Sequence, residues 1–141
     1  MNSFFKLNRL IVLFLGIGFL ALAFEVYTMH YEQLSSKPQM WIPIVFGSFA
    51  GVVIVLSGIF FFNRLFFHFF RFLMILSCFV GLLGLYFHNK WRFPQIFDFL
   101  FLHKPLDFEI FITYTPVIAP SAFIAMGGLG LLISFFEGWG K

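Results

Sequence analysis

The sequence has little charge: only 11% of its 141 residues are Asp, Glu, Lys or Arg, whereas an average soluble domain has about 25%. Apolar residues take their place, with 61% hydrophobic positions, 26 phenylalanines and a mean hydropathy of +0.97. A water-soluble protein of this size has too little interior to hide so much apolar surface. The composition therefore excludes a soluble domain, a disordered tail and a nucleic-acid-binding protein, and it predicts an integral membrane protein.

Cysteine pairs and catalytic motifs are missing as well. The single cysteine, Cys78, excludes an internal disulfide and any paired-cysteine redox or zinc motif. The phosphate-binding GxxxxGK[ST] loop and the HExxH, GxSxG and GxGxxG signatures do not occur. We therefore expect no catalytic residues, and we expect Cys78 to serve only in packing.

Four apolar runs are long enough to cross a bilayer, whose hydrocarbon core takes about 20 residues of helix. They cover residues 10–29, 41–62, 65–87 and 116–136. The loop between the third and fourth runs, 88–115, contains a shorter apolar stretch that is expected to lie in the membrane interface. The sequence thus predicts one all-α transmembrane domain over residues 1–141, a bundle of four transmembrane helices with an interfacial segment between helices 3 and 4.

Charges beside the spans predict the orientation. With four spans both termini share one side, which collects Lys6, Arg9, Arg64, Arg71, Lys141 and Glu137. The opposite side collects Lys37, Lys90, Arg92, Lys104, Glu25, Glu32, Asp98, Asp107 and Glu109. Because the side richer in Lys and Arg faces the cytoplasm, we expect a bacterial inner-membrane protein with both termini cytoplasmic and the loop 88–115 outside.

Small residues predict how the helices meet, because helices in lipid associate through close packing. The second run carries Gly47, Gly51 and Gly58, and the third carries Ser77, Gly81 and Gly84. At about 100° per residue each set shares one face of its helix. We expect these to be contact faces; the alternative is that glycine is simply common in membrane helices.

A basic stripe occupies another face of the third run. Arg64, His68 and Arg71 share this stripe, which points away from the small-residue face. We expect these side chains to reach lipid phosphates at the cytoplasmic surface. The alternative is a specific site for an anionic lipid or substrate.

Two histidines and one carboxylate are the candidate site residues. His30 and His88 end the small-residue faces of the first and third runs at the same outer boundary. Such a pair suits b-type haem, a quinone or, with Glu25 or Asp107, a divalent metal. The alternative is that both histidines cap helix ends.

Glu25 lies about one helical turn inside the outer boundary. A carboxylate inside a membrane span indicates function and requires a partner. His30, His88 and Arg92 are the candidates for that partner.

Several short motifs carry a resemblance. His30-Tyr31, Pro38-x-Met40-Trp41-x-Pro43, Phe87-His88 and Pro116-x-x-x-Pro120 resemble a family of small uncharacterised bacterial four-helix integral membrane proteins. That family has an Asn-Gly-Pro-Pro-like start to its fourth span, where this chain has Tyr114-Thr115-Pro116. The resemblance implies the fold and a membrane location, and it implies no activity.

Three functions remain open from the sequence. The first is a non-catalytic subunit or stabilising partner of a larger membrane complex, in contact with lipids and with other subunits or copies of itself. The second is a redox membrane anchor that holds b-type haem or a quinone through His30 and His88. The third is a small proton-coupled transporter that uses Glu25.

Overall fold

The fold is almost entirely helical in the computed structural model, which describes residues 3–60, 64–90, 93–105 and 118–135. Its helices are α1 (Ser3–His30), α2 (Trp41–Phe60), α3 (Arg64–Asn89), α4 (Phe93–Leu102) and α6 (Ile118–Phe135). Two short 3-10 turns, Tyr31–Gln33 and Pro38–Met40, join α1 to α2. No strand occurs in these described ranges.

Four of the helices are long and apolar enough to cross a membrane. These spans are Asn8–Gln33, Pro38–Phe60, Leu65–Asn89 and Ile118–Phe135. They match the four predicted runs to within a few residues, so the prediction of an all-α membrane fold is confirmed. Residues 61–62, 116–117 and 136, the predicted limits of the second and fourth runs, lie outside the described residues.

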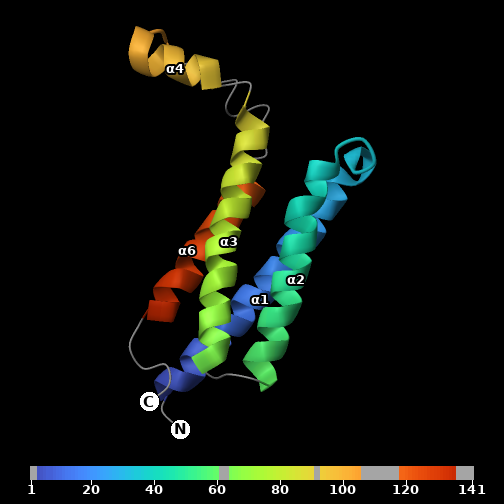
Figure 1. Ribbon diagram of the computed structural model, residues 1–141, viewed down its shortest axis with the longest axis vertical. Coiled ribbons are helices and arrows are strands. Elements are labelled where there is room, and N and C mark those ends of the chain that lie inside the picture. The colour runs from blue at the N-terminus through green and yellow to red at the C-terminus, as the bar shows by residue number, and fades with distance from the viewer. Residues whose placement is uncertain (1–2, 61–63, 91–92, 106–117, 136–141) are drawn as a thin grey trace.

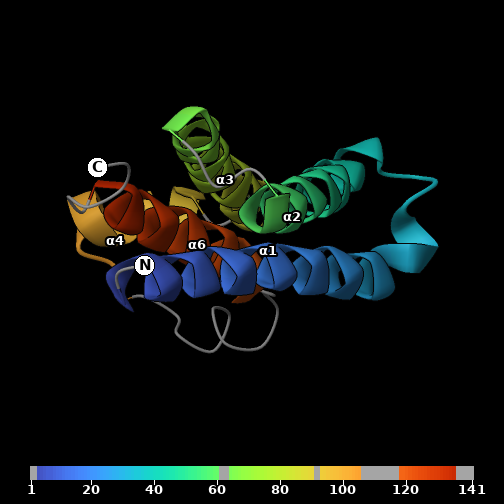
Figure 2. The same cartoon turned by 90° about the horizontal axis from the view of Figure 1, so that it is seen from below.

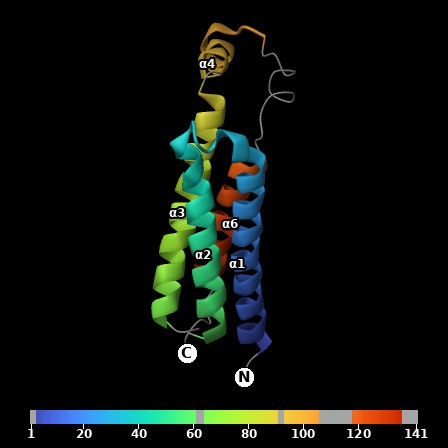
Figure 3. The same ribbon diagram turned by 90° about the vertical axis from the view of Figure 1, so that its right-hand side faces the viewer.

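The bundle consists of two antiparallel helix pairs (Figures 1 and 2). α1 packs along α2, and α3 packs along α6; the pairs meet each other less extensively, through α2 against α3 and α1 against α6. We term α1–α2 the first hairpin and α3–α6 the second hairpin. The start of α1 and the end of α6 lie at one end of the bundle, the inner end, and His30 and Asn89 lie at the other, the outer end (Figure 3).

Glycine allows close approach along the seam of the first hairpin. A Cβ added to Gly51 would lie 2.8 Å from the carbonyl oxygen of Gly16, and one on Gly47 would lie 3.1 Å from the carbonyl oxygen of Phe19. A Cβ added to Gly58 would instead lie 3.0 Å from the end of the Leu13 side chain. All three glycines that the sequence analysis named on this run therefore lie against α1.

The seam of the second hairpin combines glycine with one buried hydrogen bond. A Cβ added to Gly81 would lie 2.6 Å from the carbonyl oxygen of Pro120, and Gly84 faces the ring of the same proline. Ser77 is fully buried, and its hydroxyl donates a 2.7 Å hydrogen bond to the carbonyl oxygen of Phe123. Such close backbone approach increases the van der Waals contact that drives helix association in lipid.

Three buried phenylalanines join the hairpins in the outer half of the bundle. The rings of Phe19, Phe46 and Phe123 have their centres 5.9–6.1 Å apart, the spacing of favourable aromatic contacts. The first two come from α1 and α2 and the third from α6. The core of the bundle therefore lies between the hairpins as well as within each.

α4 lies beyond the outer end of α3 and runs across the bundle direction (Figure 1). Its apolar side chains, including Phe97, Leu100 and Phe101, are exposed. Lys104 forms a 2.7 Å ion pair with Asp98 just after the helix. An apolar helix of 10 residues is too short to span a bilayer, so a position in the interface remains the prediction for it.

Candidate functional site

The two candidate histidines meet at the outer end. Their ring centres are 5.8 Å apart, with the ring planes at 66°. His30 is the last residue of α1 and His88 is next to last in α3, so the pair bridges the two hairpins. Both side chains are half-buried.

A backbone contact determines which nitrogen of His30 is available. Nδ1 lies 3.1 Å from the carbonyl oxygen of Val26, one turn earlier in α1. A carbonyl oxygen can only accept, so Nδ1 carries the proton and donates it. In the neutral ring the lone pair is then on Nε2, which can accept a proton or bind a metal ion.

The outer ends of α1 and α3 are the carboxyl ends of their helices, so the helix dipoles place partial negative charge near the histidines. Lys37 is the nearby basic side chain; its amino group is exposed and donates a 3.3 Å hydrogen bond to Oε1 of Gln33. No group of three His, Cys, Asp or Glu side chains gathers within the described ranges. Asp107, which the sequence offered as a further ligand, lies outside them.

Glu25 does not join this pair. Its side chain is exposed on the surface of α1, among the apolar side chains of Ile17, Ala21 and Phe24. It forms no ion pair or side-chain hydrogen bond with the described part of the chain. The expected partnership with His30 or His88 is therefore absent, and Arg92, the third expected partner, lies outside the described residues.

The described side chains of the basic stripe, His68 and Arg71, differ in their surroundings. His68 is exposed, as a lipid-facing residue would be, and the side chain of Arg64 lies outside the described residues. Arg71 departs from the expectation that it points away from the bundle, because its guanidinium reaches α6. Nη2 donates a 2.5 Å hydrogen bond to the carbonyl oxygen of Ser134, and Nε lies 3.3 Å from Oγ of the same residue.

The physical reason for this departure is that α6 ends beside Arg71. The carbonyls of the last helical turn have no partner in their own helix, and guanidinium is a strong fork-shaped donor. The cation also lies 4.9 Å from the centre of the Phe135 ring, within the range of a cation–π contact.

Arg9 has the same arrangement in the first hairpin, which the sequence analysis missed. Its Nε and Nη2 donate to the carbonyl oxygens of Gly58 and Ile59, at 2.7 and 2.5 Å. The signal was an arginine near the start of one span, level with the end of the antiparallel next span. The sequence analysis treated Arg9 only as a charge beside a span and did not consider that it lies level with the end of the next helix.

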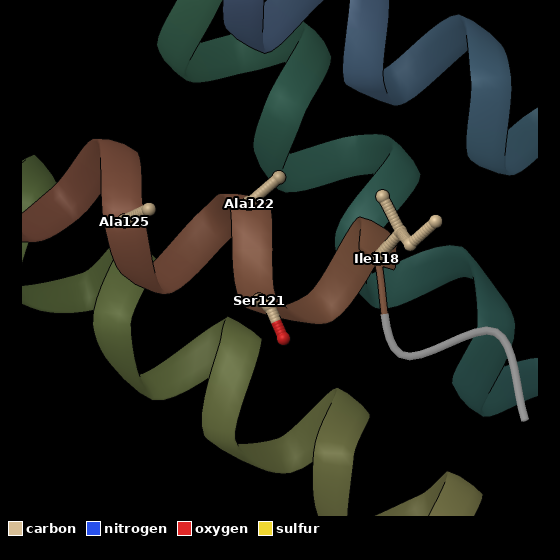
Figure 4. Close-up of a pocket in the computed structure, with 4 residues that line it drawn as sticks. All are labelled: Ile118, Ser121, Ala122 and Ala125. Carbon is tan, nitrogen blue, oxygen red and sulfur yellow. The ribbon is translucent and has the colours of Figure 1, made fainter. Parts of the chain in front are cut away.

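One shallow hollow lies on α6, and neither His30 nor His88 lines it. Its lining residues, Ile118, Ser121, Ala122 and Ala125, all belong to that helix (Figure 4). A hollow with walls from a single helix is open to the surroundings and does not enclose a ligand. It therefore adds no catalytic or cofactor site to the described part of the chain.

Any functional proposal for this chain rests on its own sequence and structure. Comparison of the chain with protein-family models, with curated proteins and with solved structures finds no match.

Proposed function

We propose that this multi-pass membrane protein is a non-catalytic subunit of a larger membrane assembly and that it docks its partner on the exposed face of α1. The observation that carries the proposal is Glu25, a carboxylate within a membrane span with no partner in the described chain. The docking partner is a transmembrane helix of another polypeptide that carries Lys or Arg at the depth of Glu25.

Charge complementarity is the reason for this choice of partner. An ionised side chain that faces lipid costs up to about 3 kcal/mol at the centre of a bilayer and less near the surface. A neighbouring cation removes much of that cost, so such residues are usually paired. Apart from Thr28, the exposed face around Glu25 is apolar, with Ile17 56% and Phe24 70% exposed, and it suits contact with a second membrane helix.

The experiment places a photo-crosslinking amino acid at Ala21 or at Thr28, which flank Glu25 on the exposed face of α1. In native membranes we expect a crosslink to one other polypeptide, lost in Glu25→Gln and kept in Glu32→Gln. Glu32 is a matched control because it is also exposed but lies beyond the end of α1. A crosslinker at Ser48, on the exposed side of α2, should give no such product.

A charge exchange completes the test. Glu25→Lys should abolish the crosslink, and reversal of the partner's basic residue to Glu should restore it. Crosslinks only between copies of this chain, or a yield that Glu25→Gln leaves unchanged, would contradict the proposal.

The location proposed with this function is the bacterial inner membrane, with the inner end of the bundle in the cytoplasm. The basic residues near the inner end, among them Arg9 and Arg71, support this orientation through the positive-inside rule. Reporter fusions at the two termini should both report the cytoplasm. A fusion after residue 104, in the outer loop, should report the opposite side.

A further inference from the structure

We propose that His30 and His88 together bind one divalent metal ion of the zinc type at the outer end of the bundle. This goes beyond the subunit role, because it assigns a ligand to the site where the two hairpins meet. The ion would bridge the last residue of α1 and the end of α3.

The separation of the rings fits an ion held between them. An imidazole nitrogen lies about 2.0 Å from zinc, so the ring centres of two ligands are about 5 Å apart at a tetrahedral angle and about 6 Å apart in a straight line. The observed separation is 5.8 Å. Because the rings now stand edge to face at 66°, seating an ion would require both side chains to turn one nitrogen toward the same point.

The hydrogen bond of His30 prepares that ring for a metal. Metal-binding histidines usually donate their other ring N–H to a carbonyl or carboxylate, which fixes the tautomer and the ring orientation. Here Nδ1 of His30 and the carbonyl oxygen of Val26 supply that contact at 3.1 Å. Nε2 is the nitrogen left to bind the ion.

The surroundings contain an exposed basic side chain, Lys37, whose amino group is held by Gln33, and partial negative charge from the helix ends. Two helix carboxyl ends meet at the site, and their dipoles attract positive charge. Within the described residues no third His, Cys, Asp or Glu side chain gathers with the pair, so the proposal assigns two protein ligands and leaves the other positions open to water. We therefore expect an exchangeable ion rather than a permanently bound structural one.

A bare ion fits better than haem. Two histidines on a haem iron have the whole porphyrin plane between them, and that plane needs open space beside both rings, whereas these rings are in edge-to-face contact. Haem would require α1 and α3 to separate along a broad slot. An ion requires only the two nitrogens.

The experiment uses the full-length protein, purified in mild detergent with an affinity tag that contains no histidine. Co²⁺ absorption and Zn²⁺ calorimetry should give one site per chain. His30→Gln and His88→Gln should each weaken binding at least about tenfold, as loss of a ligand does. His68→Gln and His103→Gln should bind like the unchanged protein, because both residues are exposed and lie apart from the pair.

A conservative variant separates ligation from folding. His88→Cys supplies a thiolate that zinc also accepts, so it should retain binding that His88→Gln loses. Zn²⁺ should raise the melting temperature of the protein and of His88→Cys, and it should leave His88→Gln unchanged.

Three results would overturn the proposal. The first is binding that persists undiminished in His30→Gln or His88→Gln, and the second is failure of both ions to bind the unchanged protein. The third is a Soret absorption band in the purified protein that disappears in these variants, which would identify haem in place of a bare ion.

Discussion

The first and second hairpins are fastened alike at the inner end and differently along their seams. In each, an arginine from the first helix binds the last-turn carbonyls of the second: Arg9 on Gly58 and Ile59, and Arg71 on Ser134. Antiparallel neighbours place the start of one helix beside the end of the next, where carbonyls lack partners. Both hairpins therefore use an arginine of one helix to bind the last-turn carbonyls of the other.

The seams differ in polarity. The first hairpin closes over glycine and apolar side chains, whereas the second adds the buried hydrogen bond from Ser77 to the Phe123 carbonyl. The connections differ too, with residues 31–40 between α1 and α2 and residues 90–117 between α3 and α6. A longer connection holds its two helices together less effectively. The extra polar contacts of the second hairpin therefore occur where the chain itself helps least.

The largest loss of stability should come from replacing the glycines in the seams by alanine. Gly81→Ala should lower the free energy of unfolding by about 1–3 kcal/mol through overpacking, because the new Cβ would lie 2.6 Å from the backbone oxygen of Pro120. Gly51→Ala should cost somewhat less, since its new Cβ would lie 2.8 Å from the backbone oxygen of Gly16, slightly farther than in Gly81→Ala. Thermal and denaturant unfolding in detergent would measure both.

Gly128→Ala is the matched control for these two variants. Nothing lies within 4 Å of a Cβ at Gly128, and alanine favours the helix over glycine. We expect stability that is unchanged or slightly higher. Equal losses in all three variants would show that the seams do not depend on close backbone approach.

Replacement of the two capping arginines should cause the next largest loss of stability. Arg71→Gln should cost about 1–2 kcal/mol, because a charged donor is removed from the end of a helix. Arg9→Gln should cost less, since each arginine donates two hydrogen bonds but only Arg71 also contacts an aromatic ring, that of Phe135. Unfolding in detergent measures the difference.

Lysine at each position sharpens this comparison between the hairpins. Arg71→Lys and Arg9→Lys keep the charge but lose the planar fork that contacts two acceptors at once. We expect partial losses, larger for Arg71. A larger loss for Arg9 would reverse the inferred difference between the hairpins.

The smallest effect should come from the buried serine. Ser77→Ala removes one hydrogen bond between helices, which is worth about 0.6 kcal/mol on average in a membrane protein. Ser48→Ala, at an exposed position of α2, should change nothing measurable. A loss above that of Gly81→Ala would mean that the polar contact, rather than close packing, holds the second hairpin together.

The helices and their small-residue faces follow from hydropathy and periodicity, because both are properties of each segment alone. The direction of Arg71 does not, since its long side chain reaches sideways to carbonyls on a helix 63 positions away in sequence. Periodicity placed its Cα correctly and misjudged where its guanidinium would bind.

For Glu25, in contrast to Arg71, helical periodicity alone predicts the observed direction of the side chain. Positions 25 and 30 are about 140° apart around a helix at 100° per residue. A face that turns His30 inward therefore turns Glu25 outward, and its side chain is exposed in the structure. The proposal that His30 is the partner of Glu25 considered only the depth of the two residues in the membrane. It did not consider their directions around the helix axis.

The capping bonds at the two ends of the bundle have a mechanical consequence. At the inner end the caps tie one helix to another. At the outer end each cap stays within its own helix, from His30 to Val26 in α1 and from Asn89 to Leu85 in α3. Separating the two helices of either hairpin at the inner end therefore breaks an arginine cap, whereas separating them at the outer end breaks none of these capping bonds.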